Sequence, residues 1–171
     1  MLRASTEFEM NCKGILKANN YSRANRLNMQ DYYKINSSSH LSAYEIRVAI
    51  WSGHRKIIMP FGDWNNGHSL RWYQNYNNVK HNRNDNFKLA NLENVLLAIS
   101  GVFTILFSQF FVLSFRPNVL VAEYSEYDGF SSHENSIFEI KPPQNWNASE
   151  CYDFEWNALK SQPNKFSNYS F

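Results

Sequence analysis

The chain has 171 residues, enough for one domain with a core of ordinary size. Its net charge of +2 is unevenly divided: residues 1–90 carry 13 Lys and Arg against 6 Asp and Glu, and residues 91–171 carry 4 against 9. The two cysteines, Cys12 and Cys151, indicate neither a disulfide framework nor a zinc site, and the first residues lack the apolar run of a secretory signal, so a cytoplasmic protein is expected.

Two helices are predicted near the start of the chain. The first covers residues 6–18, where apolar side chains recur on one side. The second covers residues 28–35 and begins at Asn28, whose side-chain oxygen can accept a free N–H group of the first turn. The serines at 37–39 are expected to form a loop.

A β-hairpin is predicted next. Large apolar side chains alternate with other residues over 44–51, which is the pattern of a strand with one buried face. A turn at 52–54 and a returning strand at 56–59 complete the hairpin, and Pro60 marks its end. A loop containing glycine then leads to a short helix or helical turn over residues 72–80.

One long apolar helix is predicted over residues 87–115, after N-cap residues at 84–86 and before a stop at Arg116-Pro117. Two adjacent stripes of this helix are apolar, so we expect it to be central, with Ile99 and Phe103 in the core. Its first stripe consists of Leu92, Leu96, Ile99, Phe103, Leu106, Phe110 and Leu113. Its remaining side is small and weakly polar, with Gly101, Thr104 and Ser108, and would allow another backbone to approach closely.

The same helix permits a membrane interpretation. Residues 95–115 are an uncharged run long enough to cross a bilayer. Several Ser, Thr and Gln residues interrupt the run, and it lacks a clear aromatic belt, so a core helix is preferred.

The chain is divided into a helical domain at 1–117 and an acidic, aromatic tail at 118–171. The tail contains too many aromatic residues for a purely disordered segment, so we expect it to pack on the helical domain or on a partner. Strands are predicted within it at 119–124 and 137–141, and a short helix at 148–159.

Residues just before the long helix carry a family resemblance. The segment YNNVKHNR at 76–83 is followed by NFKLANLENVLLAI and preceded by PFGDW and RWYQ. Together they resemble a HEPN-type helical domain of bacterial defence and mobile-element proteins, over about residues 12–111. The resemblance implies a mainly α, helical-bundle fold that is often dimeric, and many members of the family are metal-independent ribonucleases.

The family pattern is an Arg, commonly followed by Asn, with a His four to six residues beyond. Asn77 and His81 match the Asn and the His, but Tyr76 stands where the Arg is expected. Because that Arg is thought to hold the scissile phosphate, we expect RNA binding rather than cleavage.

The residues in this cluster have candidate roles in binding or cleaving RNA. His81 is the candidate general base, and Asn77 would orient its imidazole from one helical turn before. An exposed helix start at His81 would favour anion binding through free N–H groups. Tyr76 could hydrogen-bond a phosphate or stack on a base, and the candidate cations are Lys80, Arg83 and the more remote Arg71. In the alternative, His81 and the aromatic residues are structural and the cations are solvated.

The expected function is therefore an RNA-binding or degenerate ribonuclease-like HEPN domain in a defence or toxin system. The alternatives are an inactive protein-interaction module and a single-span membrane protein. The histidines are scattered and no nucleotide-binding loop is present, so neither a metal nor a cofactor is implied. The family's bundle normally has a further helix before the one at 6–18, so we expect a homodimer with the long helix in or beside the interface.

Overall fold

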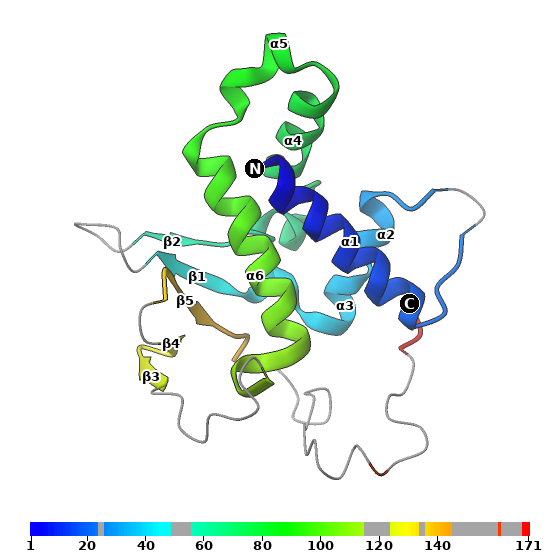
Figure 1. Cartoon of the computed structure of the whole chain (residues 1–171). Coiled ribbons are helices and arrows are strands. Elements are labelled where there is room, and N and C mark those ends of the chain that lie inside the picture. The colour runs from blue at the N-terminus through cyan, green and yellow to red at the C-terminus, as the bar shows by residue number, and fades with distance from the viewer. Residues whose placement is uncertain (24–25, 49–55, 115–123, 134–135, 145–160, 162–168) are drawn as a thin grey trace.

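The computed structural model describes the whole chain except residues 24–25, 49–55, 115–123, 134–135, 145–160 and 162–168. The fold is mainly helical, and a long helix, α6, runs between a small sheet on one side and α1 on the other (Figure 1). The elements in chain order are α1 (Leu2–Ala18), α2 (Met29–Tyr33), α3 (Ile35–Ser39), β1 (Glu45–Val48), β2 (Ile57–Ile58), α4 (Arg71–His81), α5 (Arg83–Asn86), α6 (Leu92–Ser114), β3 (Tyr124–Tyr127), β4 (Phe130–His133) and β5 (Phe138–Lys141).

The β-strands form one antiparallel sheet in the order β2-β1-β5-β4-β3. The predicted hairpin is confirmed, since Ile46 of β1 pairs with Ile58 of β2. However, β1 also pairs with β5 along its whole length, so the hairpin is part of a larger sheet and not a separate insertion. The division of the chain at residue 117 stays a prediction, although strands from both sides of it share this sheet.

Charged side chains reinforce the pairing of β1 with β5. Arg47 forms an ion pair with Glu139, directly across the two strands, and Glu45 pairs with Lys141 at 3.3 Å. The Arg47 guanidinium also lies 4.2 Å from the centre of the Phe130 ring on β4. Opposite charges on directly paired residues stabilise one register of the strands.

The first helices differ from the prediction in extent. Helix α1 begins at Leu2, earlier than expected. Helix α2 begins after Asn28 as predicted: the Asn28 side chain accepts the Gln30 N–H, and the Asn28 N–H donates to the Asp31 carboxylate. The predicted loop at 37–39 is wrong, because these serines lie in α3, where two of their hydroxyls donate to backbone carbonyls one turn earlier.

Helix α6 begins at Leu92, and the predicted start near residue 87 is wrong. The Asn82 side chain accepts the Asp85 N–H at the start of α5, and residues 87–89 form a 3-10 turn. Asn91 then accepts the Asn94 N–H through its side chain and begins the new helix. The predicted stop at Arg116-Pro117 lies outside the described residues, as do the turn at 52–54 and the helix at 148–159.

The buried side of α6 is centred on its small residues and not on the first apolar stripe, although Ala98 and Ile105 of the second stripe are fully buried as predicted. Gly101, Thr104 and Ser108, on the small side, are buried, whereas Phe103 is half-buried and Ile99 is 42% exposed. The reason is space: a Cβ at Gly101 would lie only 3.3 Å from the Trp72 ring. Small residues allow α6 to approach the rest of the fold closely, while Leu92, Ile99 and Phe110 are left exposed.

An aromatic cluster fills the space between α1, α4 and α6. The ring of Phe8 lies with its centre 5.3 Å from that of Trp72, 5.7 Å from Phe61 and 5.9 Å from Tyr73. The Trp72 indole N–H donates to the Pro60 carbonyl at 2.7 Å, so this ring is held in place. A second cluster lies between α6 and the sheet and contains Tyr44, Ile46, Val48, Ile58, Phe107, Phe138 and Ile140.

By length and composition, one helix among the described residues could cross a membrane, over Leu92–Phe110, with a mean hydropathy of 1.5. A core helix of a soluble protein passes the same test, and 44% of this segment is buried within the fold. The single-span alternative therefore stays a prediction.

Candidate functional site

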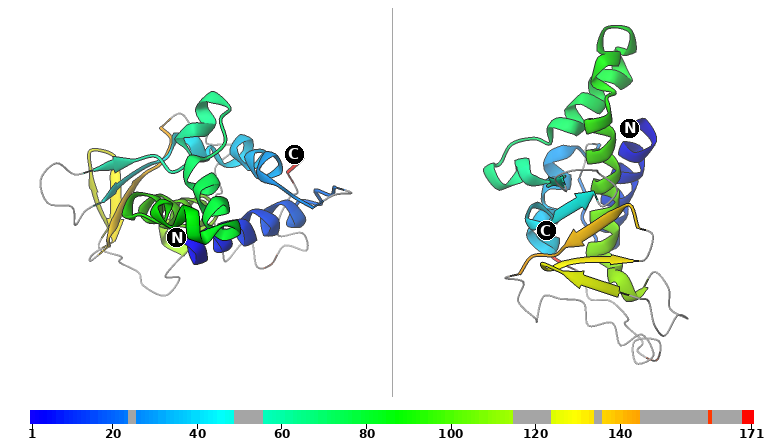
Figure 2. Two further views of the ribbon diagram at one scale, coloured as in Figure 1. Left: turned by 90° about the horizontal axis from the view of Figure 1, so that it is seen from above. Right: turned by 90° about the vertical axis from the view of Figure 1, so that its left-hand side faces the viewer.

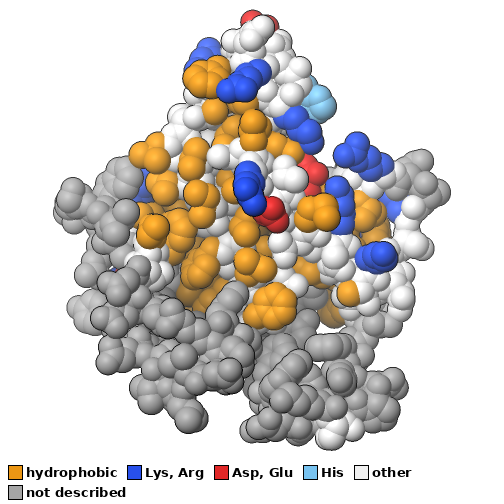
Figure 3. Space-filling view, viewed as in Figure 1, with side chains coloured by type: hydrophobic (Ala, Val, Ile, Leu, Met, Phe, Trp, Pro, Cys, Tyr) orange, Lys and Arg blue, Asp and Glu red, His pale blue; other side chains and the backbone are white. Residues whose placement is uncertain are grey.

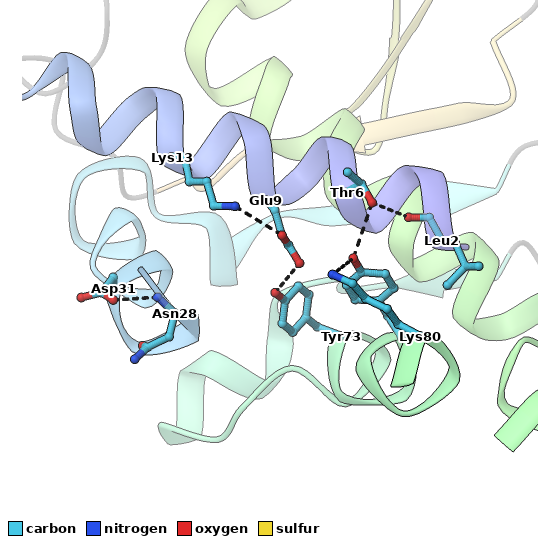
Figure 4. A network of polar contacts seen from close by, with 9 residues as sticks. Leu2, Thr6, Glu9, Lys13, Asn28, Asp31, Tyr73 and Lys80 are labelled. Atoms are coloured by element: carbon cyan, nitrogen blue, oxygen red, sulfur yellow. Dashed lines mark hydrogen bonds and ion pairs between the residues drawn. The ribbon is translucent and has the colours of Figure 1, made fainter. Parts of the chain in front are cut away.

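A network of polar side chains connects α1 with α4 at the surface of the aromatic cluster (Figure 4). The Tyr73 hydroxyl donates to the Glu9 carboxylate at 2.7 Å, and the Lys13 ammonium donates to the other carboxylate oxygen at 3.4 Å. One turn further along α4, the Lys80 ammonium donates to the Tyr76 hydroxyl at 3.0 Å.

Helical spacing explains why these side chains meet. On α1, Thr6, Glu9 and Lys13 are three and four residues apart, so they lie on one face of the helix. On α4, the polar atoms of the network come from residues 73, 76 and 80, at the same spacing. The two faces oppose each other. Tyr73 and Tyr76 of α4 contact Glu9 and Thr6 of α1 across the contact, whereas each lysine pairs with a residue of its own helix.

Glu9 is the buried charge of this network. Burial alone would raise the pKa of its carboxyl, but the hydrogen bond from Tyr73 and the positive charges of Lys80 and Lys13 together hold that pKa below the ordinary value. Glu9 is therefore ionised at neutral pH, in contact with a hydroxyl and close to two ammonium groups. Burial and the neighbouring carboxylate raise the pKa of the Tyr73 hydroxyl, so this residue is a neutral hydrogen-bond donor.

Positive charge exceeds negative charge around Glu9. The hydrogen bond to Tyr76 and the nearby Glu9 raise the pKa of Lys80, whereas Arg26 lowers it, which shows that Arg26 lies near enough to repel the ammonium. Lys13 and Lys80 thus lie near the Glu9 carboxylate, and Arg26, from a third segment of the chain, lies near Lys80. The neighbouring carboxylate of Asp31 is occupied by Arg23, at 2.8 Å.

We call Lys13, Arg26 and Lys80 the cationic cluster. Lys80 and Arg26 are exposed and Lys13 is partly exposed. The space-filling view shows Lys and Arg side chains gathered over this side of the molecule, from α4 and α5 toward α1 and α2 (Figure 3). Because these cations are exposed or partly exposed, an anion can reach them without the separation of a buried ion pair.

His81 lies in an exposed position at the last residue of α4. The expectation that it begins a helix is wrong: the backbone groups that a helix leaves free at this end are carbonyls, which do not favour an anion. Asn77 is half-buried one turn earlier. Arg83 is exposed at the start of α5, and its guanidinium lies 5.7 Å from the centre of the Phe87 ring.

Tyr76 and Arg71 are placed differently from the other candidates. The Tyr76 ring is buried against Tyr73, with ring centres 5.4 Å apart, so the ring is not presented for stacking on a base. Arg71 is the first residue of α4, and His81 is the last, so the length of the helix, about 15 Å, separates them. Lys80, His81 and Arg83 are exposed near the end of α4, far from Arg71; the Lys80 ammonium is bonded to Tyr76 and the Arg83 guanidinium lies over Phe87.

Glu9, Tyr73, Lys13 and Arg26 were not predicted from the sequence as parts of a site. The spacing of Glu9 and Lys13 is a recognisable signal for an ion pair on a helix. The hydrogen bond between Glu9 and Tyr73 joins residues 64 positions apart, and no local pattern announces it.

Metal and thiol chemistry have no evident site in the described part of the chain. No group of three His, Cys, Asp or Glu side chains among those residues could hold a metal ion. Burial and the neighbouring Glu9 raise the pKa of the Cys12 thiol, so Cys12 is not an activated nucleophile.

Comparisons of this chain with models of protein families, with curated proteins and with solved structures find no match.

Proposed function

We propose that this protein is a HEPN-like domain that binds RNA through the cationic cluster and the adjoining residues His81 and Arg83. The observation that carries the proposal is that Lys13 and Lys80 lie near one carboxylate that is already hydrogen-bonded to Tyr73, with the exposed Arg26 close to Lys80. Phosphate groups of a nucleic-acid backbone bind such surfaces mainly through Lys and Arg. The net charge of residues 1–90, near +7, also supports anion binding by this part of the chain, which contains the cationic cluster.

RNA is favoured over other polyanions because of the family resemblance at residues 76–99. The same resemblance is the basis for proposing a cytoplasmic location and a role in a defence or toxin system. Binding without cleavage is proposed, because Tyr76 occupies the position of the family's Arg and is buried, and because Asn77 and His81 are at the carbonyl end of α4.

The test is binding of a fluorescent single-stranded RNA, measured by anisotropy over a series of salt concentrations. For a single strand, the loss of one phosphate contact makes the negative slope of log K against log salt less steep by about 0.7. We expect this loss for Lys80→Gln and for Arg26→Gln. The control is Lys56→Gln, a partly exposed lysine next to β2, whose replacement should leave the slope unchanged.

Failure of the wild-type protein to bind RNA at low salt would refute the proposal. A separate incubation of RNA with the protein in a chelator tests cleavage. If the wild type cleaves and His81→Ala does not, while the thermal stability of the variant stays within about 1 kcal/mol, the protein is a ribonuclease and His81 is catalytic.

A further inference from the structure

Residues 169–171, which we call the latch, dock on the connection between α1 and α2. The Tyr169 N–H donates to the Asn19 side-chain oxygen, and the Phe171 ring packs on the edge of the Tyr21 ring, with ring centres 6.3 Å apart. Figure 1 shows this end of the chain beside the end of α1, and the view from above places it on the side of the molecule away from the sheet (Figure 2, left). Segments that are 150 positions apart in the sequence thus lie in contact.

The latch is only partly removed from solvent. Tyr169 is 42% exposed, Ser170 is exposed, and Phe171 is half-buried against the core of the helical part. The Tyr169 and Phe171 rings also contact each other, with centres 5.0 Å apart. A segment that buries so little apolar surface belongs to the parts of a fold that open at a small cost in free energy.

Tyr21 connects the latch to a buried charge of α2. Its hydroxyl donates to the Asp31 carboxylate at 2.8 Å. The same carboxylate accepts the Arg23 guanidinium and, at the start of α2, the Asn28 N–H, both at 2.8 Å. Because Asp31 is buried, the loss of one of its partners is costly. One series of contacts therefore leads from Phe171 through Tyr21 and Asp31 to the first turn of α2.

We propose that the latch is a releasable device that fixes the connection between α1 and α2. The docked Phe171 restricts the Tyr21 side chain, and a side chain that is already restricted loses less entropy when it bonds Asp31. Release of Phe171 therefore weakens the hydrogen bond from Tyr21 to Asp31. Through Asp31, it also weakens the hold on Arg23.

The same connection carries Arg26 of the cationic cluster, three residues after Arg23. The docked latch favours the arrangement in which Arg26 lies near Lys80, so it raises the affinity of the cluster for anions. This consequence rests on the proposed function. Coupling between two sites is reciprocal, so an anion bound to the cluster also stabilises the docked latch.

The first test is limited digestion of the full chain by trypsin, with cleavage after Arg23 and Arg26 followed by mass spectrometry. Phe171→Ala should speed this cleavage at least about threefold, because loss of an aromatic contact raises the open population. Cleavage after Lys88, which is exposed beyond α5, is the internal reference and should keep its rate. The matched control is Ser170→Ala, an exposed position in the same segment, which should be cleaved like the wild type.

A second variant tests the connection through Asp31 and leaves the latch itself intact. Tyr21→Phe removes the hydroxyl that donates to Asp31 but keeps the ring that packs on Phe171. It should also speed cleavage after Arg23. The double variant with Phe171→Ala should gain less than the two separate effects together, because both changes interrupt the same series of contacts.

Equal cleavage of the wild type and Phe171→Ala would overturn the latch. An equal increase after Lys88 would overturn it as well, because it would show a general loss of stability. Fully additive effects of Tyr21→Phe and Phe171→Ala would overturn the series of contacts through Asp31.

RNA binding tests the effect of the latch on the cationic cluster. In the anisotropy measurement, Phe171→Ala should raise the dissociation constant at least about twofold, and Ser170→Ala should leave it unchanged. Unchanged affinity of Phe171→Ala, together with faster cleavage, would overturn this effect. A wild type that does not bind RNA would refute the proposed function alone, because the digestion contains no RNA.

Discussion

Glu9 shows how one buried carboxylate can be kept ionised by its neighbours. The hydroxyl of Tyr73 and the two nearby lysines outweigh the effect of burial on its pKa. A carboxyl whose pKa is lower in the folded than in the unfolded chain stabilises the fold at pH values above the unfolded pKa. The stabilisation is lost as the pH falls through the folded pKa.

We therefore predict a pH-dependent effect of Glu9→Gln. At pH 7 the variant should lose about 1 kcal/mol of the free energy of unfolding, because a hydrogen bond to a charged acceptor becomes one to a neutral acceptor. The difference from the wild type should shrink below about pH 4, as Glu9 itself becomes protonated. Urea unfolding at several pH values measures both.

The control for this prediction is Glu7→Gln, which changes an exposed carboxyl on the same helix and should alter stability by less than about 0.5 kcal/mol. If the effect of Glu9→Gln were the same at pH 3 and pH 7, the carboxylate would not be the group that stabilises the contact between α1 and α4.

At the scale of the elements, two glycines in helices have opposite roles. Gly14 lies within α1, and an added Cβ there would have open space around it. Gly101 lies within α6, where a Cβ would come 3.3 Å from the Trp72 ring and 3.6 Å from the Phe61 ring. The first glycine only weakens its helix, whereas the second allows two elements to pack.

This contrast predicts opposite shifts in thermal stability. Gly14→Ala should stabilise the protein by about 0.5–1 kcal/mol, the usual gain from helix propensity. Gly101→Leu should destabilise it by about 1–3 kcal/mol through overpacking, because the hydrogen bond from Trp72 to Pro60 keeps the ring from moving aside. Circular dichroism during heating gives both values, and an unchanged melting temperature for Gly101→Leu would contradict the packing described for α6.

At the scale of the whole molecule, β5 connects the C-terminal segment to the helical part. Ile140 of β5 is buried in the cluster between α6 and the sheet, and it pairs with Ile46 of β1. Ile137, just before the strand, is 52% exposed. The two isoleucines therefore test whether the sheet and the helices unfold together.

Ile140→Ala should lower the free energy of unfolding by about 2–5 kcal/mol, since it leaves a cavity in the core. Because the sheet and the helices are expected to unfold together, the loss of stability should also be seen in the helix content, followed by circular dichroism. Ile137→Ala should change stability by less than about 0.5 kcal/mol. If the helices of the Ile140→Ala variant unfold at the same temperature as those of the wild type, the C-terminal segment forms a separate unit.

Local patterns in the sequence were sufficient for several elements. The cap at Asn28, the alternation that forms β1 and β2, and the strand at 138–141 were all predicted, because each depends on residues a few positions apart. The exposure of Lys80, His81 and Arg83 follows from the polar sequence at the end of α4, whereas their role in a site stays a prediction.

Only the tertiary structure decided which side of α6 is buried and where charge gathers. The sequence of α6 has large apolar side chains around much of the helix, so periodicity could not choose a side. The choice depends on the shape of Trp72 and Phe61, which favours the small residue Gly101. In the same way, Glu9 meets Tyr73 and Arg47 meets Glu139 across 64 and 92 positions of the chain, and such contacts exist only once the elements have packed.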